Sequence, residues 1–186
     1  MNSNIEQYSD ERLFAMLRGP KAKSEAAFGE LYNRYSPRIK AYCLRVVGNM
    51  EQAEDLFQET FLRFYKSAQV DRKMTNVPGF LLRIARNLCL NYKRDKRDTV
   101  TLENFHFSTK PHSHERAELL DLIATALELL EFDYREAFVL REYDGLSYKE
   151  ISAIVGDSVS AVKTRVFRAK QKIRNILSPY LEDLAH

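Results

Sequence analysis

The side chains best suited to recognition chemistry lie between Ser158 and Asn175, a stretch with six basic residues and no acidic one. At helical spacing its apolar residues share one side, which must face a core. This apolar stripe consists of Val159, Val162, Val166, Ala169, Ile173 and Leu177. The other side carries groups that suit DNA, because Lys and Arg bind phosphates while Thr, Arg and Gln reach base edges. The candidate DNA-contacting residues are Ser160, Lys163, Thr164, Arg165, Phe167, Arg168 and Gln171.

The residues just before this stretch predict how the helix is positioned. A short amphipathic helix is expected from Ser147 to Val155, and Gly156 interrupts its pattern. Glycine suits a turn position with positive φ, and Ser158 can cap the helix that follows. Together these features predict a helix-turn-helix whose second helix lies in the DNA major groove. A solvated basic face on a helical bundle is the competing interpretation, but it does not explain why these features coincide.

A second candidate surface lies on a helix expected to begin near Glu51. Its predicted buried stripe consists of Ala53, Leu56, Phe57, Phe61 and Phe64. The opposite side places one leucine among acidic and amide groups: Asp55, Gln58, Glu59 and Leu62. Such a face could dock a partner with a basic rim. A solvated helix face with one exposed leucine is the alternative.

A third candidate surface lies on the helix opened by Val77-Pro78-Gly79, after an expected loop from Ser67 to Val77. Leu81, Ile84, Ala85, Leu88 and Tyr92 are expected in the core. The other side presents Arg83, Arg86, Asn87, Lys93, Arg94 and Arg97. This side could bind a nucleic acid backbone while the loop receives unstacked bases. Solvation of a helix end explains the charges equally well.

The remaining elements are also predicted to be helical. Asp10 could cap a first short helix, and Ser24 could begin the second, in which Pro37 predicts a kink or break. Further helical patterns are expected from Leu119 to Leu130 and from Tyr134 to Tyr143. Between residues 115 and 150 there are ten acidic and four basic residues, so the scaffold of the last unit is acidic.

Length and composition indicate an all-α protein of two small helical domains. The chain has 186 residues, 45% hydrophobic, with 6 Gly and 5 Pro and a formal net charge of +3. A flexible N-terminus is expected over residues 1–9, a first domain over 10–98, a flexible linker over 99–117, and the helix-turn-helix domain over 118–186. Because the charge is unevenly placed, its distribution says more about partners than its total.

Several functional classes are not supported. No apolar run could span a bilayer, and the N-terminus does not read as a signal peptide, so a cytoplasmic protein without membrane insertion is expected. Cys43 and Cys89 read as buried thiols, and the histidines of the linker lack metal-ligand spacing. No glycine loop, metal cluster or nucleophile–base signature appears, so neither an enzyme nor a cofactor is expected.

The ordered motifs resemble the sigma-70 family of bacterial transcription initiation factors, specifically its extracytoplasmic-function (ECF) group. The similarity rests on AAFGELYNRYSPRIKAYCLRVVGN, QAEDLFQETFLRFYKS and FLLRIARNLCLNYKRDKR in the first domain. In the second it rests on REAFVLREYDGLSYKEISAIVGDSVSAVKTRVFRAKQKIR. Where the family often has Trp-Leu-Tyr, this chain has Phe80-Leu81-Leu82, and it contains no tryptophan.

The resemblance implies a task for each surface. The face with Asp55, Gln58, Glu59 and Leu62 would dock on the clamp helices of the β′ subunit of core RNA polymerase, and the β flap would be a second contact. Phe80 and the basic face after it would recognise and open the minus-10 element. The helix-turn-helix would read the minus-35 element of promoter DNA. An anti-sigma factor would hold the protein until a stress or another signal releases it.

Two other functions compete with a sigma factor. An autonomous helix-turn-helix regulator would bind duplex DNA by itself, but it usually needs a dimerisation element and leaves two of the three surfaces unexplained. A decoy that binds polymerase without reading DNA should have lost the basic face of its last helix.

Overall fold

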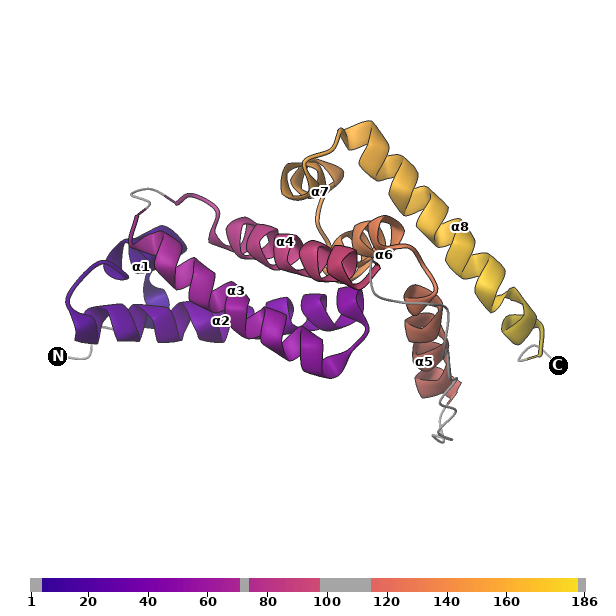
Figure 1. The fold of residues 1–186 in the computed structure, drawn as a ribbon, viewed down its shortest axis with the longest axis horizontal. Helices are drawn as coiled ribbons and strands as arrows, with labels where there is room; N and C mark the ends of the chain where they lie inside the picture. The colour runs from indigo at the N-terminus through magenta and orange to yellow at the C-terminus, as the bar shows by residue number, and fades with distance from the viewer. Residues whose placement is uncertain (1–4, 71–73, 98–114, 184–186) are drawn as a thin grey trace. The chain divides into compact units, whose positions relative to one another are not determined.

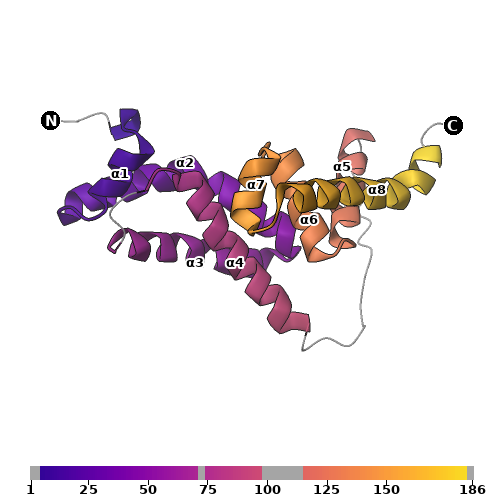
Figure 2. The same ribbon diagram turned by 90° about the horizontal axis from the view of Figure 1, so that it is seen from above.

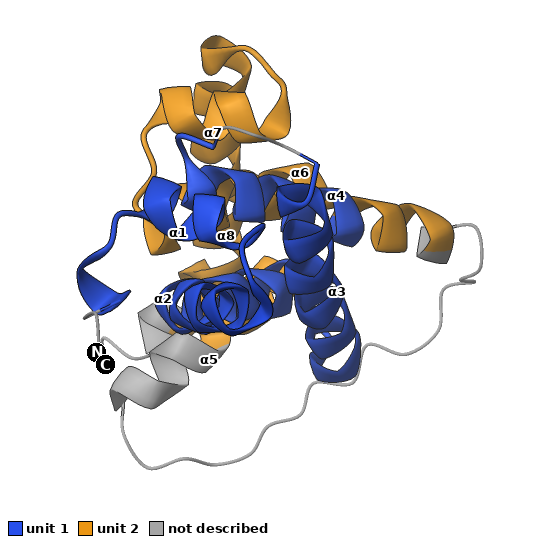
Figure 3. Ribbon diagram, turned by 90° about the vertical axis from the view of Figure 1, so that its left-hand side faces the viewer, with its two compact units in different colours: residues 1–89 blue, residues 90–186 orange. Residues whose placement is uncertain are grey.

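A computed structural model describes residues 5–70, 74–97 and 115–183, and the chain folds as two compact units, residues 1–89 and 90–186 (Figure 3). Within the described ranges the backbone forms helices and turns and no strand, so the predicted all-α class is confirmed. Most of the predicted linker, residues 99–117, lies outside those ranges. Its extent and the predicted domain boundaries therefore stay predictions.

Unit 1 is built on a long helical hairpin (Figure 1). The element η1 (Ile5–Gln7) and helix α1 (Asp10–Met16) precede α2 (Lys21–Val47) and α3 (Met50–Ala68). Gly48 ends α2 with φ 76°, a left-handed conformation that favours glycine, and Asn49 caps α3 through its side chain. Helix α4 (Val77–Arg97) follows and its first part completes the unit. Viewed from above, α1 lies beside the beginning of α2 (Figure 2).

The start of unit 1 differs from the predictions in two details. Ser9, and not Asp10, caps α1, and Asp10 instead pairs with Arg34 of α2 at 2.9 Å. Ser24 does not begin α2; it lies buried inside the helix and donates to the carbonyl of Leu17 at 2.8 Å. The carbonyl of Leu17 lies at the end of α1, where it has no intrahelical donor, and Ser24 supplies one. The spacing of residues along one helix does not reveal such contacts between helices.

Pro37 does not break α2, which runs without interruption from Lys21 to Val47. Its ring lies on the exposed side, whereas Leu31 and Ile39 on either side of it are buried. The apolar contacts of the hairpin therefore keep the helix continuous through Pro37, at the cost of one backbone hydrogen bond.

Helix α4 presents a wider apolar side to the core than predicted. Asn76 caps it by accepting from the backbone N–H of Gly79 at 2.9 Å. The core positions Leu81, Ala85 and Leu88 are confirmed, but Leu82 and Cys89 are also buried. The predicted core positions that are only half-buried are Ile84 and Tyr92 here and Leu56 of α3. The stripe is thus rotated slightly around the helix, because neighbouring helices and not the spacing alone decide which side is covered.

Unit 2 consists of α5 (Glu115–Glu128), α6 (Phe132–Phe138), the π-helical segment η2 (Val139–Tyr143), α7 (Tyr148–Val155) and α8 (Val159–Asp183). The predicted single segment from Tyr134 to Tyr143 is therefore two elements. The wider π turn is closed by the N–H of Asp144, which donates to the carbonyl of Val139 at 3.1 Å. Gly145, with φ 67°, then leads the chain into α7.

A buried arginine holds the end of α5 in unit 2. Arg135 of α6 is 5% exposed and donates to the carbonyl of Leu130 at 3.2 Å and to that of Glu128. Burial lowers the pKa of its guanidinium from the ordinary value of arginine. Glu128 and Leu130 are at the end of α5, where carbonyl groups have no intrahelical donor. Arg135 thus supplies from another helix the cap that the sequence of α5 lacks.

We predict that Arg135→Ala lowers the stability of unit 2 by roughly 2–3 kcal/mol, because buried carbonyl groups lose their donor. Thermal unfolding followed by circular dichroism measures the change. Arg174→Ala, at an exposed position on α8, is the control and should shift stability by no more than about 0.5 kcal/mol. Equal melting temperatures for the two variants would contradict the capping role.

Candidate nucleic-acid and polymerase interfaces

The turn between α7 and α8 has the predicted helix-turn-helix features. Gly156 ends α7 with φ 81°, and Ser158 caps α8 by accepting from the N–H of Ala161 at 3.1 Å. The start of α7 is fixed by a reciprocal capping box between Ser147 and Glu150. Sequence reasoning missed this box, although its signature, Ser-x-x-Glu before an apolar run, is present in the chain.

The two sides of α8 are those expected, with one exception. Val162, Val166, Ala169, Ile173 and Leu177 are buried. The last three of these pack with Ala126, Leu127 and Leu130 of unit 2. Val159 is 38% exposed, so its assignment to the core was wrong. As the first residue of α8, it lies at the turn, before the helix enters the core.

The predicted DNA-contacting side chains share the uncovered side of α8. Phe167 is 61% exposed, which is unusual for a large apolar ring. The hydroxyl of Thr164 donates to the carbonyl of Ser160 at 3.0 Å, so its oxygen still has acceptor capacity. Arg165 is half-buried, and the exposed members of the set are Ser160, Lys163, Thr164, Phe167, Arg168 and Gln171.

Ion pairs divide the six basic side chains of α8 into two groups. Three of them are paired with carboxylates of unit 2: Arg165 with Asp157 at 2.5 Å, Lys170 with Glu142 at 2.8 Å and Lys172 with Glu131 at 3.5 Å. Among the described residues, Lys163, Arg168 and Arg174 have no carboxylate partner. The free positive charge of the helix is therefore smaller than its composition indicates.

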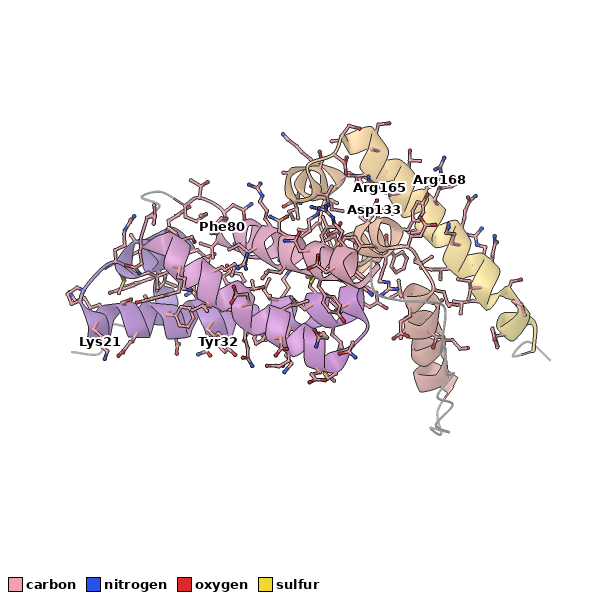
Figure 4. All side chains as sticks on the ribbon, viewed as in Figure 1. Lys21, Tyr32, Phe80, Asp133, Arg165 and Arg168 are labelled. Carbon is pink, nitrogen blue, oxygen red and sulfur yellow. The ribbon has the colours of Figure 1, made fainter. Side chains whose placement is uncertain are left out.

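A shallow pocket of about 450 Å³ adjoins this side of α8. One wall carries hydroxyl and guanidinium groups of α8, and the other carries carboxylates from the start of α6. Figure 4 labels Arg165, Arg168 and Asp133 at this place. The lining residues are Ser158, Ser160, Ala161, Thr164, Arg165, Arg168, Glu131, Asp133 and Tyr134. The lining thus combines hydrogen-bonding and charged groups with the apolar surface of Ala161 and the Tyr134 ring.

The candidate docking side of α3 is exposed and acidic. Leu62 is 46% exposed, Asp55 and Gln58 are exposed, and Glu59 is half-buried and paired with Arg63 at 2.6 Å. Sequence reasoning missed Glu54, whose carboxylate pairs with Lys40 of α2 at 2.6 Å. The hydrogen bond from Lys40 lowers the pKa of Glu54, which stays ionised at neutral pH.

The polar side of α4 exposes Arg83, Asn87 and Arg94 and leaves Arg86 and Lys93 half-buried. The side chain of Arg97 lies outside the described residues, as do residues 71–73 of the predicted loop. Phe80 is half-buried, and its ring centre is 6.2 Å from that of Phe64 in α3 (Figure 4). The loop is also shorter than predicted, because α3 continues through Ala68.

The described residues contain neither a metal-binding cluster nor a membrane-spanning helix. No group of three or more His, Cys, Asp or Glu side chains in the described part of the chain could hold a metal ion. Likewise, no helix among those residues is long and apolar enough to cross a membrane.

Comparison with known proteins identifies both units. The family model described as Sigma-70 region 2 matches residues 31–99, and that described as Sigma-70, region 4 matches residues 120–173. The RNA polymerase sigma-H factor of Pseudomonas aeruginosa is 31% identical, covering 96% of this chain and 99% of its own. The ECF RNA polymerase sigma-E factor of Escherichia coli is also 31% identical, over 95% of this chain and 98% of its own.

Two solved structures share the fold at 25% identity. The first is the sigma factor RpoE in complex with the anti-sigma factor NepR from Bartonella quintana, with a TM-score of 0.67 over 81% of this chain and 96% of its own. The second is CnrH in complex with the cytosolic domain of CnrY, with a TM-score of 0.67 over 92% and 99%.

These matches account for both halves of the chain, including the surfaces that an autonomous helix-turn-helix regulator leaves unexplained. They overturn that alternative and establish a transcription initiation factor, not an enzyme. The resemblance inferred from the sequence motifs is confirmed: the chain belongs to the extracytoplasmic-function group of the sigma-70 family of RNA polymerase sigma factors.

Proposed function

We propose that this sigma factor selects promoters through three separate helix faces, each assigned to one partner. The observation that supports the proposal is the exposed side of α8. The start of this helix is capped by Ser158 and its apolar side is buried, while every charged residue between Ser158 and Asn175 is basic. A helix with these properties fits the major groove, where it can bind phosphates and base edges together.

The minus-35 element is read by α8. Arg168 is the strongest candidate for a base contact, because it is exposed and, among the described residues, has no carboxylate partner. Thr164 and Gln171 supply further polar groups, and the Phe167 ring can contact a thymine methyl group. Lys163 binds phosphate, and Ser160 lies where the helix enters the groove. Arg165 belongs to the same face, but its ion pair with Asp157 makes it the smallest contributor to DNA binding.

The minus-10 element is recognised by α4 and the segment before it. Exposed Arg83, Asn87 and Arg94 can bind the phosphate backbone, with half-buried Arg86 and Lys93 beside them. Arg97, predicted from the sequence to share this side, completes the proposed set. Phe80 is half-buried against Phe64, so part of its ring is free to contact an unstacked base. This ring takes the place of the tryptophan that is frequent in the family.

Core RNA polymerase binds the exposed side of α3. Leu62 supplies a small apolar contact, and Asp55, Gln58 and Glu59 surround it with groups that suit a basic partner such as the clamp helices of β′. Unit 2 provides the second attachment, on the β flap, as expected for the family.

An anti-sigma factor controls the protein in the cytoplasm. Both solved relatives were captured with such inhibitors or with a cytosolic partner domain. A bound inhibitor that covers the faces of α3 and α8 would block polymerase and DNA together, and a stress or another signal would release it.

Co-purification with bacterial core polymerase, followed by transcription from a genomic fragment library, tests this function. We expect stable association and a discrete set of transcripts that share two upstream elements. Association without transcripts would instead indicate a decoy, and no association would refute the proposal.

We predict that Arg168→Ala weakens binding of the minus-35 element by roughly 1–3 kcal/mol and relaxes base preference at one position. Binding of holoenzyme to promoter fragments with single base changes measures both effects. Arg174→Ala is the matched control, because this arginine is exposed beside the face and should lower affinity for all fragments alike. Unchanged base preference in the Arg168 variant would contradict direct reading.

We predict that Asp55→Ala combined with Leu62→Ala lowers affinity for core polymerase at least about tenfold while the protein stays folded. Both side chains are exposed, so the melting temperature should change little. Met50→Ala removes another exposed apolar side chain of α3 and should leave polymerase binding intact. A loss of helicity in the double variant would show that this face is part of the core.

A further inference from the structure

Two acidic residues of unit 2 are placed against lysines of α8. Glu142 of η2 holds Lys170, and Glu131, just before α6, holds Lys172, whose ammonium also lies 4.8 Å from the ring centre of Tyr134. These carboxylates come from two elements that precede the helix-turn-helix. Each occupies a lysine that composition alone would assign to DNA phosphates.

We propose that Glu142 and Glu131 are affinity-setting residues that limit the sequence-independent attraction of α8 for DNA. The inference rests on the proposed function of α8 and adds two residues from outside the recognition helix. A lysine held by a carboxylate binds phosphate only after the ion pair breaks, and the carboxylate then repels the same phosphate.

The exposure of these pairs determines how strong the effect is. The side chains of Lys170 and Glu142 are 49% and 35% exposed, so water and salt weaken their attraction and DNA can compete for the lysine. The pair therefore reduces affinity moderately and does not block binding. By contrast, the side chain of Arg165 is only 26% exposed and lies 2.5 Å from the carboxylate of Asp157, which suits a pair that fixes the turn.

The division of charge also indicates how promoters are distinguished. Phosphate contacts raise affinity for every sequence alike, whereas base contacts discriminate among sequences. With Lys170 and Lys172 occupied, the basic contacts are left to Lys163, Arg168 and Arg174, which have no carboxylate partner among the described residues. Lys163 lies 5.7 Å from the ring centre of Tyr148, a contact that does not neutralise its charge. Base contacts therefore supply a larger share of the binding free energy than they would if all six basic side chains of α8 could bind phosphate.

The test is a double-mutant cycle on Glu142 and Lys170 in the full chain bound to core RNA polymerase. Equilibrium binding is measured on a promoter duplex and on a shuffled duplex over a range of salt concentrations. We expect Glu142→Gln to raise affinity roughly two- to fivefold on both duplexes. The slope of log affinity against log salt concentration should become steeper by about one, as for one added phosphate contact.

The same substitution in a Lys170→Gln background distinguishes a local ion pair from a general change in net charge. If Glu142 acts by holding Lys170, the gain disappears in that background. Glu51→Gln is the control for net charge, because it removes one charge from an exposed position of α3 that makes no ion pair in the described structure. An equal gain in both backgrounds, a gain no larger than that of Glu51→Gln, or no gain would overturn the inference.

Failure of the inference is distinguishable from failure of the proposed function. If Arg168→Ala weakens binding but Glu142→Gln behaves like its control, α8 still reads DNA and only the role of Glu142 is wrong. If holoenzyme with the wild-type chain shows no salt-dependent binding to either duplex, both proposals are refuted.

Discussion

Helix α8 has to satisfy two opposite requirements, and the rest of unit 2 depends on this constraint. One side buries Ala169, Ile173 and Leu177 against α5, while the other side must stay uncovered and basic. Burial of this apolar surface supplies the free energy that holds α8 in unit 2, at roughly 25 cal/mol per Å². Each residue of the stripe therefore contributes to stability and also sets which side chains face outward.

Other interactions in unit 2 keep α8 in this orientation. The capping box of α7, the left-handed Gly156 and the Ser158 cap fix the turn, and the pair between Asp157 and Arg165 joins that turn to α8. Arg135 ties the end of α5 to α6, so the helices that receive the apolar stripe are themselves held in place. The exposed side of α8 thus keeps a defined orientation within unit 2, because polar contacts satisfy the helix ends around it.

Unit 1 solves a similar problem with a helical hairpin. The carbonyl of Leu17 at the end of α1 accepts from Ser24 of α2 and from Gln69 just after α3, so three segments meet at one oxygen. Aromatic rings of α2 and α3 pack between the two helices, with Tyr32 and Phe61 at a centroid distance of 4.8 Å. Because this core uses the inner sides of the helices, the acidic side of α3 and the basic side of α4 remain exposed.

The sequence by itself determined the helical class, the turn at Gly156, most of the apolar stripes and the faces of α3 and α8. Those features depend on helical periodicity and on the conformational preferences of single residues, both of which are local. Tertiary structure alone decided that Pro37 is tolerated, that Val159 is exposed and that Arg135 caps α5. It also decided which lysines of α8 are paired, because Glu131 and Glu142 reach them from elements distant in the chain. Such pairings arise from packing between helices, and periodicity within one helix carries no information about its neighbours.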